Sequence, residues 1–324
     1  MALKSKPTLA MLVLSLLGVI VAVSAREPLI GLLTRKPLPP ALAVPEVKQP
    51  PSPERVAAPH LGWAEQECNQ VIDEHVKAID TFFADSKQNT PAFAEVALSW
   101  GSKWRLVADH VPFTDGGRHE TYIRERFEEY VFTPAQLEDA VKQVVAGYLK
   151  HVESIEGQML VRIRTDVADF PSAYLIARVD ESKLQASYND AVARVIEATG
   201  SNLRADIATE LVSIITGEVL TQVAVRLGVS AGILGAGAAS SWATFGVGII
   251  VGVIVDQIVS WVWDWYADPK GNLATELDGK LDEINELLVN GSDDTEGLRA
   301  RLRAFAKERA TVRSRAVMAL LQSE

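Results

Sequence analysis

The feature that most constrains the fold of this chain is an apolar stretch over residues 229–266, which carries no charged side chain before Asp256. An apolar segment of this length is stable only inside a protein core or in contact with lipid. The amphipathic segments on either side are therefore expected to cover this stretch or to carry it.

Small residues recur at every fourth position of this stretch. Residues four apart share one side of a helix, and grooves of small residues let a second helix approach closely, as in membrane helix pairs. The pattern predicts a Gly-rich helical hairpin that turns at Ser240 and Ser241, with Gly228, Gly232, Gly248 and Gly252 as helix-packing positions. The two faces consist of Ala224, Gly228, Gly232, Ala236 and Ser240, and of Thr244, Gly248, Gly252, Asp256, Ser260 and Asp264.

The second half of the hairpin is long enough to cross a bilayer. Residues 242–263 would extend roughly 33 Å as a helix, against roughly 30 Å of hydrocarbon. Trp242 at one end, and Trp261 and Trp263 at the other, resemble interfacial aromatic belts. Asp256 opposes a span, because a carboxylate at this depth costs roughly 2.5–3.5 kcal/mol and needs a partner. Two interpretations follow: a transmembrane or inducible bilayer contact, and a buried core hairpin of a soluble bundle.

The N-terminus has the features of a targeting signal. Lys4 and Lys6 precede an apolar run over residues 9–25, which predicts a signal anchor or, with cleavage after Ala25, a signal peptide. We favour an anchor at residues 1–25 that leaves the body exported, in the membrane of a bacterial cell envelope. Nine prolines follow between Pro28 and Pro59. They predict an extended Pro-rich linker over residues 26–60.

The remaining sequence has helical periodicity. An amphipathic helical domain is expected over residues 61–228, with single helices at 173–199 and 203–227, and a C-terminal helical hairpin over residues 267–324. The clearest helix start is Thr133 to Gln136, a capping box with Pro134 at the first helical position. The apolar stripe that follows has coiled-coil spacing, and this helix should run about 35 residues and end before Pro171.

No strand pattern is found in the sequence. The fold class expected is therefore all-α: a multi-helix bundle around a Gly-rich hydrophobic helical hairpin.

The last helix, expected to start at residues 293–296, has a basic face. We expect this face to pair with the acidic residues Asp278, Asp282, Glu283 and Glu286 of the preceding helix. Attraction to anionic lipid headgroups is the alternative. The basic residues are Arg299, Arg301, Arg303, Lys307, Arg309, Arg313 and Arg315.

Motifs for chemistry are weak. The net charge of −10 argues against nucleic acid as a partner. The single cysteine, Cys68, excludes an intrachain disulfide. Cys68 and His75 lie on one apolar stripe, where a packed thiol and a core histidine are favoured over metal ligands. Residues 228–232 match G-x-S-x-G but follow a helical segment, with no histidine later in the chain. No catalytic residue, cofactor, metal or small-molecule ligand is predicted.

Two functions are consistent with these features. The first is a non-enzymatic, membrane-tethered envelope protein whose hairpin mediates helix packing, homo-oligomerisation or contact with a lipid bilayer. The second is a pore-forming or membrane-inserting protein whose hairpin enters lipid on a trigger. A hydrophobic hairpin wrapped by amphipathic helices is similar in architecture to the pore-forming domains of colicins, although no residue motif is shared.

Overall fold

The computed structural model describes residues 49–99, 102, 118–199, 208–227, 242–264 and 269–322. In these residues the chain is predominantly helical, which confirms the all-α fold class. Residues 50–324 belong to one compact unit. The predicted anchor at residues 1–25, the linker as far as residue 48, and the first half of the hairpin with Gly228 and Gly232 lie outside the described residues.

Helix α1, Pro53–Lys87, begins inside the segment that the sequence assigns to the Pro-rich linker. The Ser52 hydroxyl accepts a hydrogen bond from the Arg55 amide, and Pro53 occupies the first turn, where its missing N–H costs nothing. Val56 is buried, so the first turn is also held by the core. The predicted linker boundary at residue 60 was therefore too late, even though Pro59 lies within the helix.

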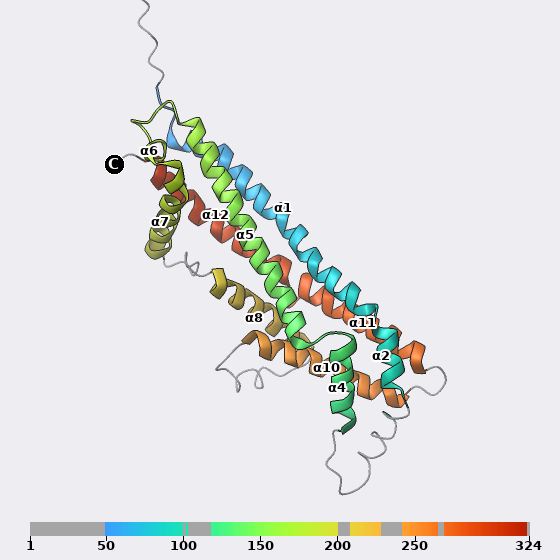
Figure 1. The fold of residues 1–324 in the computed structure, drawn as a ribbon. Helices are drawn as coiled ribbons and strands as arrows, with labels where there is room; N and C mark the ends of the chain where they lie inside the picture. The colour runs from blue at the N-terminus through green and yellow to red at the C-terminus, as the bar shows by residue number, and fades with distance from the viewer. Residues whose placement is uncertain are drawn as a thin grey trace, which may run out of the picture. The chain divides into compact units, whose positions relative to one another are not determined.

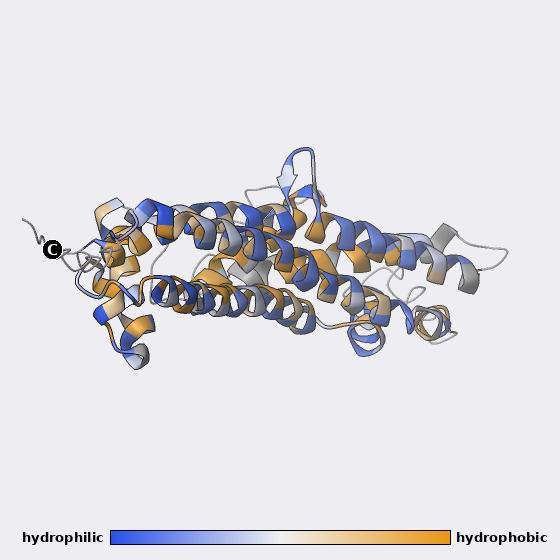
Figure 2. Cartoon of the chain, turned by 90° about the horizontal axis from the view of Figure 1, so that it is seen from above, coloured by the Kyte–Doolittle hydropathy of each residue, from blue (hydrophilic) through white to orange (hydrophobic). Residues whose placement is uncertain are grey.

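Helix α5, Pro134–Asp166, starts at the predicted capping box and ends before Pro171. Thr133 accepts from the Gln136 amide at 3.2 Å, and the Gln136 side chain accepts from the Thr133 amide at 2.7 Å. Helix α1 packs against both α5 and α12, Leu298–Leu321 (Figure 1). These long helices are hydrophobic on one side and hydrophilic on the other, as the two colours along them show (Figure 2). The predicted stripe of α5 is buried throughout: Leu137, Val141, Val144, Tyr148, Val152, Ile155 and Met159.

Shorter helices complete the unit. The helix predicted over residues 173–199 is divided into α6, Leu175–Arg178, and α7, Glu181–Thr199, because Val179 adopts an extended conformation. Helix α8, Ala208–Arg226, packs against α5 and α10, Trp242–Asp264. Helix α4, Arg118–Tyr130, also packs against α10.

Helices α2, Thr90–Ala97, and α11, Pro269–Val289, lie side by side, and α11 also packs against α1. A short hairpin joins α11 to α12, with strands β1, Gly291–Ser292, and β2, Thr295–Glu296. Gly291 has φ +80°, and a Cβ there would clash with the Thr295 carbonyl oxygen. The chain therefore reverses at a glycine, and α12 starts at Leu298 rather than at residues 293–296. The sequence analysis missed these two strands because each is only two residues long.

Candidate functional site

Helix α10 is the described half of the predicted apolar hairpin. Its inner face lies against α8, α4 and α5 and is completely buried. The predicted site residues Gly248, Gly252 and Asp256 share the opposite side of the helix. Trp242 is its first residue, Trp263 is its penultimate residue, and Trp261 is half-buried against the core. The buried residues are Val247, Ile250, Val251, Ile254, Val255 and Ile258.

The groove expected at Gly248 and Gly252 is not filled by any described helix. A Cβ at Gly248 would meet no described atom within 4 Å, and one at Gly252 would lie 3.9 Å from Nη2 of Arg124. These glycines therefore do not mark a close approach of two helices within the described part of the chain. Their use as packing positions would require a helix from outside the described residues.

Asp256 lies on the same open side and is exposed. Partial exclusion of water by its surroundings raises the pKa of its carboxyl, and the negative charge of Glu120 adds to this effect. The charge of Arg124 opposes the increase, but Arg124 is itself paired with Glu120 at 3.0 Å. The carboxyl of Asp256 therefore takes up a proton at a higher pH than that of an ordinary surface aspartate.

Helix α8, which packs against α10, also leaves apolar side chains exposed. It buries Val219 and Val223 but leaves Ile214 45% and Val225 41% exposed. A helix facing water normally carries charged residues on its outer side. We use the term α8–α10 surface for the outward side of these two helices, defined by Ile214, Val225, Gly248, Gly252 and Asp256.

A search of the described residues finds no helix with both the length and the apolar character needed to cross a membrane. Asp256, Gln257 and Ser260 interrupt the apolar sequence of α10 and are exposed. The alternative interpretation of the sequence, a helix packed on a core, describes the inner face of α10.

A charge cluster that no pattern in the sequence indicates lies inside the bundle. Arg309 donates through Nε and Nη2 to the two carboxylate oxygens of Glu156, at 2.9 and 2.7 Å. Arg313 donates from Nε to the same carboxylate at 3.1 Å. Glu156 is 0% and Arg313 1% exposed. One buried carboxylate therefore holds two guanidinium groups, and the cluster has an excess positive charge.

The surroundings of this cluster do not neutralise that charge. Nη2 of Arg313 lies 3.5 Å from Sγ of Cys68, but burial raises the pKa of this thiol despite the nearby arginine. Burial, together with the charge of Glu156, also raises the pKa of Tyr188. Nη1 of Arg313 and the hydroxyl of Tyr148 are buried and have no hydrogen-bond partner within the described part of the chain. The cluster joins α12 to α5 and α1, and its role is in packing and stability.

The basic face of α12 pairs with acids other than those predicted. Arg299 pairs with Asp73 of α1 at 3.0 Å, and Arg301 pairs with Glu218 of α8. The predicted acidic partners of α11 make other contacts: Asp278 accepts from Thr90, Asp282 from Lys87, and Glu283 from Lys280. The expectation was wrong because the basic face of α12 is turned toward α1, α5 and α8.

Cys68 and His75 do not form a common site. Cys68 faces Arg313, whereas Nε2 of His75 lies 3.4 Å from Nδ1 of His151. Among the described residues, no group of three or more His, Cys, Asp or Glu side chains is arranged to hold a metal ion. The G-x-S-x-G match at residues 228–232 lies outside the described residues.

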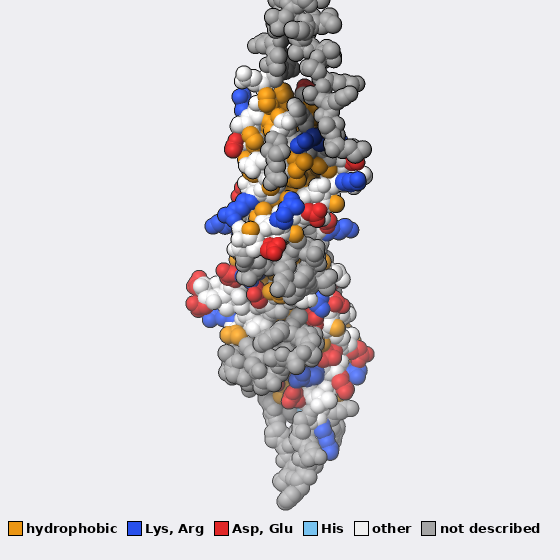
Figure 3. Space-filling view, turned by 90° about the vertical axis from the view of Figure 1, so that its left-hand side faces the viewer, with side chains coloured by type: hydrophobic (Ala, Val, Ile, Leu, Met, Phe, Trp, Pro, Cys, Tyr) orange, Lys and Arg blue, Asp and Glu red, His pale blue; other side chains and the backbone are white. Residues whose placement is uncertain are grey.

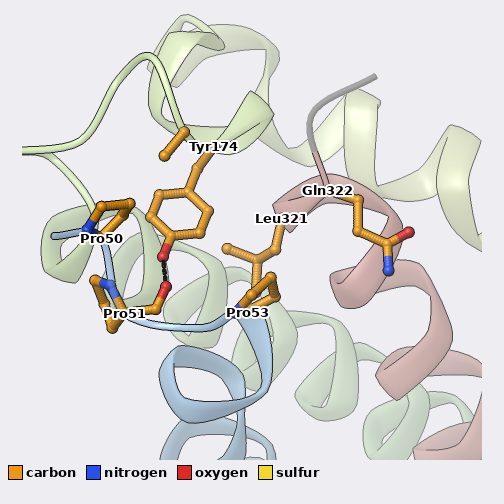
Figure 4. Close-up of a pocket in the computed structure, with 7 residues that line it drawn as sticks. Pro50, Pro51, Pro53, Tyr174, Leu321 and Gln322 are labelled. Atoms are coloured by element: carbon orange, nitrogen blue, oxygen red, sulfur yellow. Dashed lines mark hydrogen bonds between the residues drawn. The ribbon is translucent and has the colours of Figure 1, made fainter.

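A pocket of 280 Å³ lies beside the last prolines of the linker. The Tyr174 hydroxyl donates a hydrogen bond to the Pro51 carbonyl oxygen (Figure 4). Hydrophobic side chains also gather at the α6 end of the face shown in Figure 3. Leu175, the first residue of α6, is exposed. The hydrogen bond from Tyr174 to Pro51 holds the start of the body in place. The residues that line the pocket are mainly apolar: Pro50, Pro51, Pro53, Ala173, Tyr174, Leu321 and Gln322.

Comparison of the chain with protein-family models, with curated proteins and with solved structures gives no match. Interpretation of the function therefore depends on the α8–α10 surface and on the chemistry of its residues.

Proposed function

We propose that the protein is a non-enzymatic helical protein of a bacterial cell envelope that is tethered to the membrane and contacts the bilayer through its α8–α10 surface. The N-terminal anchor and the Pro-rich linker hold the body near the membrane. The apolar hairpin of residues 229–266, of which α10 is the second half, makes the contact. A homo-oligomer formed through the same surface is the competing outcome.

The observation that supports this proposal is the exposure of large apolar side chains on α8, the helix that packs against α10. Ile214 and Val225 are exposed on α8, and the space over Gly248 on α10 is open among the described residues, whereas Arg124 of α4 lies within contact distance of Gly252. Apolar patches on a protein surface usually mark contacts with proteins or membranes. The tether would raise the effective concentration of this surface at the bilayer.

The test must separate contact by α10 from binding by the N-terminal anchor. We would attach an environment-sensitive fluorophore to Gly252→Cys in a Cys68→Ala background of the full chain. Addition of vesicles of phosphatidylethanolamine and phosphatidylglycerol should shift the emission to the blue, because the fluorophore enters an apolar medium. The same fluorophore on Asp190→Cys of α7 is the control and should not shift.

Two outcomes would count against bilayer contact. Equal spectra at position 252 with and without vesicles would contradict it directly. A blue shift that depends on protein concentration and needs no vesicles would identify a second copy of the chain as the occupant.

A second candidate function, acid-triggered insertion of the hairpin, is favoured by the environment of Asp256. The pKa of this carboxyl is raised above the ordinary value of 3.8. The charged form of Asp256 is less stable in lipid than on the surface of the folded protein. Asp256 therefore takes up a proton when α10 enters the membrane. Membrane association should therefore strengthen as the pH falls toward the pKa of Asp256.

Asp256→Asn makes this hypothesis testable, because asparagine imitates the neutral acid. The variant should release dye from the same vesicles at neutral pH, whereas the wild type should release it only under acidic conditions. Asp190→Asn, an exposed aspartate on α7, should behave as the wild type. Absence of leakage for both wild type and Asp256→Asn between about pH 7 and pH 4 would eliminate triggered insertion.

A further inference from the structure

Two histidines that are distant in the sequence meet where α1 packs against α5. Nε2 of His75 lies 3.4 Å from Nδ1 of His151, and the ring planes cross at 87°. His151 is exposed and His75 is half-buried, so the pair can be reached from solvent. Neither ring is engaged by a carboxylate among the described contacts.

The separation of these two nitrogens is long for a hydrogen bond. By comparison, the contact from Nε2 of His60 to the carboxylate of Asp166 measures 2.7 Å and is an ordinary hydrogen bond. In a tetrahedral zinc site with Zn–N bonds of about 2.0–2.1 Å, two nitrogen ligands lie about 3.3–3.4 Å apart. The His75–His151 distance matches this tetrahedral edge.

The helix surface beneath the pair is shaped to admit the ring of His75. A Cβ at Gly147 would lie 3.0 Å from Cε1 and 3.1 Å from Nδ1 of His75, so only glycine leaves full room for the ring. Burial, reinforced by the charge of His151, lowers the pKa of His75, although Glu74 opposes this change. This change favours the neutral imidazole, which is the form that binds a metal.

We infer that His75 and His151 form a two-imidazole site for a divalent transition-metal ion such as Zn²⁺, which links α1 to α5. The remaining coordination positions are taken by water, because no third His, Cys, Asp or Glu side chain joins the pair among the described residues. A bound ion stabilises the folded state, in which the two helices lie together, over the unfolded state.

Zinc is the probe for this site, and the full-length protein, first treated with a chelator, is the sample. Calorimetric titration with Zn²⁺ should show one saturable ion per chain. The melting temperature followed by circular dichroism should rise by on the order of 3 °C at tenfold excess over the dissociation constant. His151→Gln should abolish both effects without changing the melting temperature in chelator, because His151 is exposed.

His60→Gln is the matched control and should bind zinc as the wild type does. Replacement of Zn²⁺ by Co²⁺ should produce the intense visible absorption of a tetrahedral cobalt site. Equal zinc binding by wild type and His151→Gln would overturn the inference, as would zinc binding that His60→Gln also removes. A weak cobalt spectrum of the octahedral type would refute the tetrahedral geometry.

Discussion

Glu156→Ala is expected to lower the free energy of unfolding by about 3–5 kcal/mol, the cost of removing one partner from a buried ion pair. The substitution leaves Arg313, which is 1% exposed, without its carboxylate in the interior. Arg309 loses both of its short hydrogen bonds to Glu156. Equilibrium urea unfolding of the purified full-length protein, followed by circular dichroism, measures this change.

Two further variants identify the cause of the loss. Glu153→Ala removes an exposed glutamate from the same helix and should change stability by less than about 0.5 kcal/mol. A combined Glu156→Leu, Arg309→Leu and Arg313→Met variant removes all three charges and should recover most of the lost stability. If the triple variant is as unstable as Glu156→Ala, the penalty comes from packing and not from unpaired charge.

The charge cluster also shows where sequence-based prediction failed. Glu156 follows Ile155 directly, on a helix whose apolar stripe was correctly predicted. Its partners Arg309 and Arg313 are more than 150 positions away and were expected to face the acidic residues of the preceding helix. The four-residue spacing of the two arginines indicates that they share one side of a helix. It does not indicate which other helix packs against that side. Long-range pairing therefore had to come from the structure.

Local signals were more informative. The start of α5 followed from Thr133 and Gln136, because a capping box depends only on residues three positions apart. The start of α1 was misplaced, since the prolines were taken to exclude a helix although Pro53 occupies the first turn. For the candidate site, the sequence identified the small-residue positions of α10 but predicted a packed groove there, and no described atom approaches Gly248. It did not reveal the exposed apolar side chains of α8, because exposure depends on the packing of neighbouring helices.

Phe127→Ala is expected to destabilise the protein by about 3–5 kcal/mol, because it removes a large aromatic side chain from a close-packed core. Phe127 is fully buried on α4, and its ring centroid lies 5.1 Å from that of Phe132 and 5.9 Å from that of Phe93. This aromatic contact fixes α4 to α2 and to the start of α5. Urea unfolding measures the loss, and Glu125→Ala, an exposed position on α4, should leave stability nearly unchanged.

The same variant links stability to the proposed membrane contact. Helix α4 packs against α10 and carries Glu120 and Arg124, the charged groups nearest to Asp256. Weaker packing of α4 lowers the free energy needed to separate α10 from the bundle. With vesicles present, the emission of a fluorophore at position 252 should therefore shift further to the blue in Phe127→Ala than in the wild type. Phe127→Leu retains most of the buried apolar area and should give an intermediate shift. If Phe127→Ala is destabilised but its vesicle-dependent shift equals that of the wild type, α10 contacts the bilayer without leaving the bundle.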